Sequence, residues 1–132
     1  MSFKDVSHDV VISSVSKELK KNEAIKEPDW LAMVKTGMQS ERLPSEPDFW
    51  FKRAAALLLT IANHGPVGVE RLRNKYGGRK RHGVNRHHHK KAGGKNIRLL
   101  LQQLETAGLV KKEKTGRVIT PKGVSLLDKA GK

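Results

Sequence analysis

The sequence of 132 residues contains no cysteine, and between Arg71 and Leu104 it contains no aspartate or glutamate. Without cysteine, disulfide bonds and thiolate chemistry are excluded, which suits an intracellular protein. The longest apolar run, Ala54 to Leu59, is far shorter than the roughly 20 residues that a membrane span requires, and the N-terminus has no apolar segment of signal-peptide length. We therefore expect a soluble, cytoplasmic protein that spans no membrane.

Positive charge is distributed unevenly along the chain. Residues 1–50 carry seven Lys/Arg and nine Asp/Glu, whereas residues 51–132 carry twenty Lys/Arg and four Asp/Glu. The net charge is +14, and eleven of the Lys/Arg lie in the acid-free segment, residues 71–104. Such a field attracts a polyanion and destabilises the folded chain by self-repulsion when no partner is bound. RNA, DNA or an anionic membrane surface would each satisfy this charge.

The first part of the chain shows helical periodicity followed by prolines. Apolar residues recur every four positions at Val11, Val15 and Leu19, which predicts one narrow apolar helix face. Pro44 and Pro47 indicate an irregular connection. The elements expected in this part are a helix capped by Ser7, a short helix that begins at Pro28 and ends before Gly37, and a loop over residues 38–47.

A run of apolar residues behind Asp48 predicts a central helix. Ser45 and Asp48 resemble a capping box ahead of this helix, and Gly65-Pro66 ends it. Trp50 and Ile61 share one face, while further apolar residues occupy the other faces. Because a helix that is apolar on most of its circumference lies at the centre of a domain, we expect the other helices to pack around it.

The second half of the chain contains further regular elements and one long basic segment. Apolar residues from Ile97 to Leu104 follow the i, i+3, i+4, i+7 pattern of a helix, whereas residues 77–95 show no hydrophobic periodicity. The expected elements are a short helix over Val69–Tyr76, an irregular basic loop over residues 77–95, a helix capped by Asn96 and stopped by Gly108, strands over Leu109–Glu113 and Arg117–Thr120 around a Thr115-Gly116 turn, and a last helix that starts with Thr120-Pro121.

Helix, short helix, longer helix and two-stranded hairpin is the order of a winged helix-turn-helix. The predicted fold class is therefore mainly α: a helical bundle around a central helix, with a winged helix-turn-helix core and a two-stranded β-hairpin wing. We expect a single domain over residues 1–132, with an N-terminal helical extension over residues 8–47 and the winged-helix core over residues 48–130. About twenty residues join the two helices of the motif, where three or four are usual. We therefore expect this extension to be functional, and the alternative is a solvated, disordered stretch.

The basic loop, residues 77–95, has the chemistry of a nucleic-acid-binding segment. Its Lys and Arg side chains cannot pack against one another without like-charge repulsion, whereas phosphates relieve that repulsion and release counterions. Arg favours bidentate phosphate contacts, and Arg or His planes stack on unpaired bases. For the two cations on the central helix, a plain polar face is the alternative. The predicted RNA-binding residues are Lys52, Arg53, Lys75, Arg79, Lys80, Arg81, His82, Arg86, Lys90, Lys91, Lys95 and Arg98.

Metal, nucleotide and catalytic chemistry are disfavoured. The adjacent histidines His87–His89, together with His82, do not converge easily on one metal ion, and the surrounding cations would repel it. The Gly-Gly-Lys sequence at residues 93–95 lacks the spacing and the Ser/Thr of a P-loop, and no nucleophile motif is present. We therefore expect no metal, cofactor, small-molecule substrate or enzymatic activity.

A winged-helix transcription regulator that binds duplex DNA is the alternative function. The order of elements and the TPKG sequence after the second wing strand are typical of such proteins. The long basic insertion would obstruct docking of the motif in the major groove, and no strong dimerisation helix is present. A membrane-surface module would need an amphipathic basic helix with bulky apolar residues opposite its charges, and the sequence contains none.

Five segments of the chain occur in the same order in one known family: PDW…MVKTG, PDFWFKRAAALL, GPVGVERLRNKYGGRKRHGV, LLQQLETAGLVKK and GRVITPKG. On these motifs, of which the third is the most specific, the chain resembles the archaeal and eukaryotic protein nineteen of the small ribosomal subunit. That family is unrelated to the bacterial protein of the same number. The resemblance extends from about Asp9 to Ala130. The chain departs from it at Leu59, where the family often has a basic residue, and at His88 and His89, where it often has an aromatic one.

The resemblance implies an all-helical fold around a central helix with a winged-helix core. It also implies a structural constituent of the small ribosomal subunit that binds rRNA of the 3′ major domain in the subunit head, beside neighbouring ribosomal proteins, and that contributes to subunit maturation. We expect the protein to clamp rRNA through residues 77–95, with the helix that follows Asn96 and the wing as secondary surfaces. The functional surfaces implied by the resemblance comprise Phe49, Trp50, Arg53, Arg79, Lys80, Arg81 and Arg98.

Overall fold

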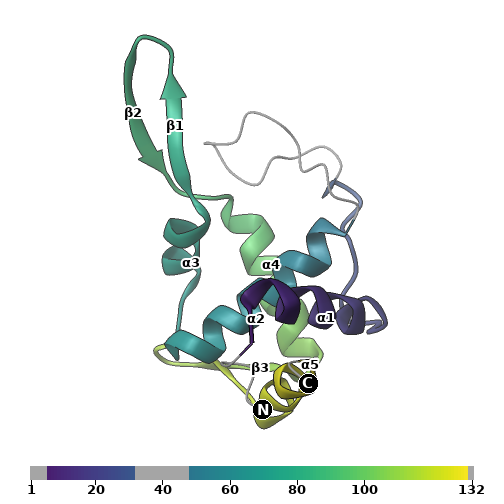
Figure 1. Ribbon diagram of the computed structural model, residues 1–132. Helices are drawn as coiled ribbons and strands as arrows, with labels where there is room; N and C mark the ends of the chain where they lie inside the picture. Colours follow the sequence, from purple (N-terminus) through teal and green to yellow (C-terminus); the bar gives the residue numbers. More distant parts are fainter. Residues whose placement is uncertain (1–5, 32–47, 131–132) are drawn as a thin grey trace.

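The computed structural model describes residues 6–31 and 48–130, without the side chains of residues 80–82, 85 and 87. Within these ranges the chain is mainly helical, as predicted, and forms two antiparallel hairpins (Figure 1). None of the helices described is long and apolar enough to cross a membrane. In chain order the elements are α1 (His8–Lys20), α2 (Phe49–His64), α3 (Val69–Tyr76), β1 (Gly78–His82), β2 (Asn85–Lys90), α4 (Gly94–Thr106), β3 (Val110–Glu113), β4 (Gly116–Ile119) and α5 (Pro121–Ala130).

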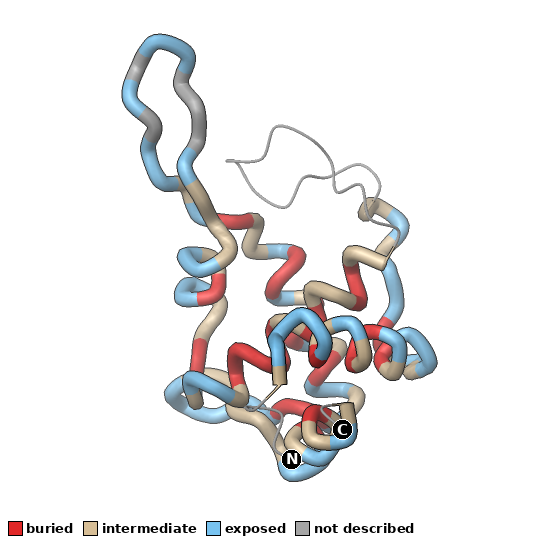
Figure 2. Tube along the Cα trace, viewed as in Figure 1, coloured by how far each residue is buried: buried red, intermediate tan, exposed pale blue. Residues whose placement is uncertain are grey.

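The central helix is α2, and its burial confirms the predicted core. Trp50, Leu57 and Leu58 are fully buried, and α1, α4, α5 and β4 all contact this helix. Each large apolar side chain buried in this way stabilises the fold by roughly 1.5–3 kcal/mol. Figure 2 shows the buried residues where these elements meet, whereas the β1–β2 hairpin is largely exposed where it is described.

The starts of the first two long helices differ from the sequence prediction in their capping. The helix α1 begins at His8 and buries its predicted apolar face, but the side chain of Ser7 makes no capping hydrogen bond. Asp48 precedes α2 and also makes no side-chain cap. Its carboxylate instead accepts a hydrogen bond from Lys20 Nζ at 2.9 Å, so it joins the end of α1 to the start of α2. Ser45, the other residue of the predicted capping box, lies outside the described residues.

Most of the segment between α1 and α2 also lies outside the described residues, including the predicted loop over residues 38–47. Of the short helix predicted from Pro28, the structure describes one turn, in which Leu31 N–H donates to the Pro28 carbonyl at 3.1 Å. Trp30 in this turn packs edge-on against Trp50, with ring centroids 6.1 Å apart and an interplanar angle of 88°. This aromatic contact anchors the turn to the core.

The predicted winged-helix order is present in α3, α4, β3 and β4. The helix α4 starts at Gly94, three residues earlier than a cap at Asn96 predicts, and Asn96 is buried in its first turn instead of capping it. The buried Ala92 donates its N–H to the Arg73 carbonyl of α3 at 2.9 Å. This hydrogen bond holds the chain against α3 directly before Gly93, the residue that precedes α4. The helix ends as predicted, with Gly108 in the left-handed region at a φ of 82°.

The wing, β3 and β4, forms as predicted with a shift of one residue at its turn. The two-residue turn is Lys114–Thr115 rather than Thr115–Gly116. Gly116, at a φ of 138°, instead crosses the backbone of Val67, where a Cβ atom would lie only 2.8 Å from the carbonyl carbon. Behind the wing, Gly123 N–H donates to Thr120 Oγ1 at 3.3 Å, which confirms the predicted cap of α5.

The prediction of an irregular loop over residues 77–95 is wrong, because most of this segment is the β1–β2 hairpin. The two strands are antiparallel and are joined by a Gly83–Val84 turn, in which Gly83 has a φ of 68°. The hairpin projects from the helical body (Figure 1). A strand with one buried face alternates polar and apolar residues, whereas the side chains that the structure describes in this hairpin are exposed or half-buried. Its sequence therefore carries no periodic signal.

Candidate nucleic-acid interface

The β1–β2 hairpin concentrates positive charge on a projecting element. Residues 78–90 contain five Lys/Arg and four His, and no acidic residue. The side chains of Arg79 and Arg86 are exposed to solvent. Lys80, Arg81 and His82 lie in β1, and their side chains are not described. An element that presents like charges to solvent along two strands is suited to contact a polyanion.

The register of the hairpin places an arginine of β1 beside a histidine of β2. Arg79 pairs with His89 across the strands, and Gly78 pairs with Lys90. At the far end, the turn exposes the Val84 side chain completely. Sequence reasoning assigned no role to this valine, which is an apolar side chain at the tip of a cationic element.

The charged surface continues from the hairpin onto α4, which follows it directly in the chain. Lys95 and Arg98 in the first part of this helix are both exposed. Lys95 Nζ lies 4.9 Å from the ring centroid of Trp30, a cation–π contact that leaves its ammonium group at the surface. Arg98 is thus exposed as predicted, near the helix end from which the hairpin emerges (Figure 1).

Trp50 does not belong to an exposed surface, although the family resemblance implied it. Its side chain is fully buried, and its Nε1 donates a hydrogen bond to Gln103 Oε1 at 2.9 Å. Gln103 in turn donates through Nε2 to the Lys26 carbonyl at 2.9 Å. The tryptophan therefore joins α2 to α4, and its role in this structure is packing.

The predicted cations on α2 and α3 have partners within the protein. The Arg53 guanidinium lies 5.1 Å from the ring centroid of Phe49 and 4.3 Å from that of Tyr76. Burial lowers the pKa of Arg53, and the neighbouring Tyr76 partly opposes this shift. Lys75 Nζ donates to Thr60 Oγ1 at 2.8 Å, and Lys52, the third cation of this group, is half-buried. These contacts join α2 to α3.

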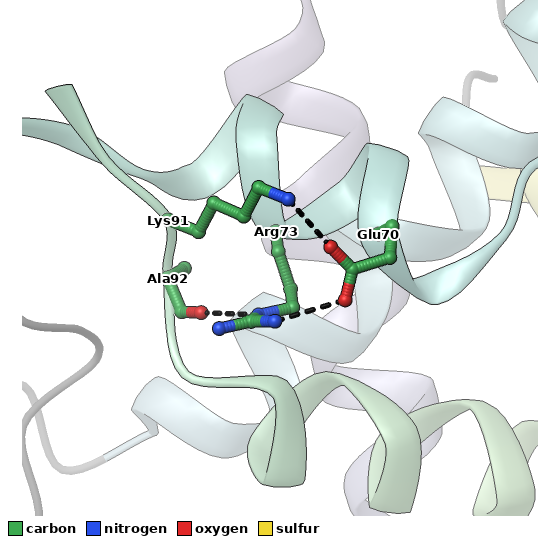
Figure 3. A network of polar contacts seen from close by, with 4 residues as sticks. All are labelled: Glu70, Arg73, Lys91 and Ala92. Atoms are coloured by element: carbon green, nitrogen blue, oxygen red, sulfur yellow. Dashed lines mark hydrogen bonds and ion pairs between the residues drawn. The ribbon is translucent and has the colours of Figure 1, made fainter.

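A polar network joins the root of the hairpin to α3 (Figure 3). Glu70 accepts from Arg73 Nη1 at 2.9 Å and from Lys91 Nζ at 2.7 Å. Arg73 Nε also donates to the Ala92 carbonyl at 2.9 Å. Hydrogen bonds from Lys91 and then Arg73 lower the pKa of the Glu70 carboxyl below its ordinary value of 4.5. Lys91, which the sequence assigned to RNA, is therefore bound to a carboxylate in this structure.

The sequence as a whole matches a family of known proteins. A profile of the family described as ribosomal protein S19e matches residues 2–132. The chain belongs to this family.

Individual relatives agree with the family assignment. The chain is 40% identical over 132 residues to the small ribosomal subunit protein eS19 of Thermoplasma volcanium, covering 100% of this chain and 88% of that protein. It is 44% identical over 127 residues to the eS19 of Aeropyrum pernix, covering 94% and 83% of the two chains. It is 38% identical over 130 residues to the eS19G of Ascaris suum, covering 97% and 88%. Archaeal and eukaryotic relatives are both represented, as the resemblance implied.

Membership in the S19e family identifies the chain as a ribosomal protein and not an enzyme, as the sequence predicted. The charged hairpin is therefore the surface of a structural component of the ribosome. Its projecting cations call for an explanation by binding, because an S19e protein has no reaction to perform.

The sequence of this S19e protein did not predict the polar network of Glu70 and Arg73. Arg73 was counted as one cation of the acid-free segment, and Glu70 lies just before that segment. One signal was present: Glu70 is the single acidic residue among residues 49–104, which contain thirteen Lys/Arg. A lone acid among so many cations is expected to be an ion-pair partner.

Proposed function

We propose that this protein is a structural constituent of the small ribosomal subunit that binds rRNA of the 3′ major domain in the subunit head. The observation that carries the proposal is the projecting β1–β2 hairpin, which exposes Arg79 and Arg86 and contains no acid. The ribosomal context comes from the S19e family and from its relatives in the small ribosomal subunit. The hairpin, Lys95 and Arg98 form the proposed RNA-binding surface.

Phosphate binding accounts for the charge of this surface. Each phosphate that a cation neutralises releases counterions, which favours binding. The logarithm of affinity therefore falls by roughly 0.7–0.9 per contact for each unit by which the logarithm of the salt concentration rises. Arginine also forms bidentate phosphate contacts and stacks on unpaired bases. Val84 at the tip adds an apolar side chain that can contact a base or a sugar. This combination fits irregular RNA better than a regular duplex.

The remainder of the chain supports two further parts of the proposal. Residues 1–50 carry a slight excess of acid and are suited to face neighbouring ribosomal proteins instead of RNA. A protein that joins rRNA to other proteins restricts the conformations of the RNA, and in this way it contributes to small-subunit maturation. The DNA-binding alternative shares the winged-helix order of elements, but the β1–β2 hairpin projects from between the two helices that would dock in a groove and would obstruct that docking.

The test is a salt titration of binding to a small-subunit rRNA 3′-domain transcript. The variant R79A/R86A removes two exposed cations of the hairpin, and we expect its salt slope to fall by about 1.4–1.8. The matched control, K17A/K129A, removes two exposed cations from α1 and α5 and is expected to retain the full slope. Equal slopes for the two variants would contradict the role of the hairpin.

Sedimentation of a cell lysate at low and high salt tests the ribosomal assignment independently. We expect the protein to migrate with small subunits and to remain there at salt concentrations that strip loosely bound proteins. Migration with chromosomal DNA would instead favour the transcription-regulator alternative.

A further inference from the structure

The hairpin meets the body of the protein at one compact joint, formed by Glu70, Arg73, Lys91 and Ala92 (Figure 3). The two oxygens of Glu70 are used separately, Oε1 by Arg73 and Oε2 by Lys91. Arg73 comes from α3, which leads into β1, whereas Lys91 directly follows β2. One carboxylate therefore joins the residues that precede the hairpin to those that follow it.

Arg73 and Ala92 are joined in both directions at this joint. Arg73 Nε donates to the Ala92 carbonyl at 2.9 Å, and Ala92 N–H donates to the Arg73 carbonyl at 2.9 Å. Ala92 is 1% exposed, so this pair of hydrogen bonds lies at the edge of the core. The chain that leaves β2 is consequently held against α3 before it enters α4.

Two glycines permit this close approach. A Cβ atom at Gly77 would collide with the carbonyl oxygen of Lys90, so β2 passes directly over the position where α3 ends. A Cβ atom at Gly94 would lie 3.2 Å from Arg73 Cδ, which is tighter than ordinary van der Waals contact. Both ends of the hairpin thus pack so closely on the last turns of α3 that neither glycine position has room for a Cβ atom at an ordinary contact distance.

An acidic residue at this position is unfavourable on long-range electrostatic grounds alone. The Glu70 side chain is 64% exposed and lies beside the most positive element of the chain, where it weakens the attraction for RNA. An isolated two-stranded hairpin is only marginally stable, and a binding element that is already held in place loses less conformational entropy when RNA binds. An acid that held the hairpin in the orientation for RNA binding would favour RNA binding, and this effect would oppose the repulsion between RNA and the Glu70 charge.

We propose that Glu70 and Arg73 are positioning residues, which fix the direction of the β1–β2 hairpin and raise RNA affinity without contacting RNA. This inference rests on the proposed function of the hairpin. Simple charge counting predicts that loss of the Glu70 charge strengthens RNA binding. The positioning role predicts the opposite, namely that loss of this charge weakens RNA binding.

The experiment compares E70Q and R73A with E113Q, which removes one exposed acid of the wing that also pairs with a lysine. Affinity for the rRNA transcript and its salt slope are measured for the full-length chain, together with amide hydrogen exchange. We expect E70Q to weaken binding about two- to fivefold through its two exposed ion pairs, and R73A to weaken it about tenfold, both with unchanged salt slope. E113Q is expected to bind as tightly as the wild type or slightly more tightly.

Hydrogen exchange separates positioning from general destabilisation. In E70Q and R73A the Ala92 amide should exchange faster, while amides in the middle of α2 keep their protection. Tighter RNA binding by E70Q, unchanged exchange at Ala92, or a salt slope that falls in R73A would each overturn the inference. A fall in slope would mean that Arg73 itself contacts a phosphate.

The R79A/R86A variant distinguishes failure of the joint from failure of the proposed function. If that variant binds RNA as tightly as the wild type, the hairpin is not the RNA-binding element and both proposals fall. If it binds weakly while E70Q and R73A bind as the wild type does, only the positioning role of the joint falls.

Discussion

Replacement of Arg53 tests whether this cation serves the fold or the RNA. Its guanidinium lies 4.3 Å from the ring centroid of Tyr76 and 5.1 Å from that of Phe49, so it joins α2 to α3. A cation over an aromatic ring contributes roughly 0.5–1 kcal/mol when exposed and about 2 kcal/mol when desolvated. With two rings and a half-buried side chain, we expect R53A to lower the free energy of unfolding by about 1–3 kcal/mol.

A double-mutant cycle in urea denaturation isolates the contact with Tyr76. The four chains are the wild type, R53A, Y76L and the double variant, since leucine retains apolar bulk without an aromatic face. We expect a coupling free energy of about 0.5–2 kcal/mol. The exposed Lys17, changed to alanine, serves as control and should alter stability by less than about 0.5 kcal/mol. A coupling below about 0.3 kcal/mol would refute the packing role, and a lower salt slope for R53A would place its guanidinium on a phosphate.

Three further predictions concern the core and the joint. Leu101 is fully buried, so L101A should lower the free energy of unfolding by about 2–5 kcal/mol in thermal or urea denaturation, and a loss below about 1 kcal/mol would contradict its place in the core. G77A should accelerate amide exchange in β1 and β2, because its methyl group would collide with the Lys90 carbonyl oxygen; unchanged exchange would mean that the two backbones are farther apart. Because hydrogen bonds from its cationic partners lower the pKa of Glu70, its ion pairs should persist above pH 4.5 and be lost as pH falls through the lowered pKa, and an NMR titration midpoint at or above 4.5 would argue against them.

Local signals in the sequence predicted most of the helices and the wing. The apolar pattern of the central helix, Gly108 at a helix end and Thr120-Pro121 at a helix start each act within a few residues, and the structure confirms all three. The predicted side-chain caps at Ser7 and Asn96 did not form: α1 begins directly after Ser7 without a hydrogen bond from its side chain, and α4 begins before Asn96. Periodicity thus predicted that the helices exist, and local signals predicted several of their ends, whereas the start of α4 at Gly94 had no such signal.

The hairpin was not predicted because its sequence has neither of the usual signals. Strand prediction relies on alternating burial, and both strands are largely exposed where described. Its turn is Gly83–Val84, which lacks the Asn-Gly or Asp-Gly signature of the most recognisable hairpin turns. The two ends of the hairpin meet at the joint on α3, where residues far apart in the chain lie together.

The sequence by itself determined the charge of this protein, its central helix and its family. Charge is a property of composition, so the acid-free segment from Arg71 to Leu104 was visible before any fold was known. Only the tertiary structure decided which cations have intramolecular partners. Lys91 meets a carboxylate 21 residues away, whereas Arg79 in the same basic segment is exposed on the hairpin. Such partners are chosen by long-range packing, which no local pattern of residues encodes.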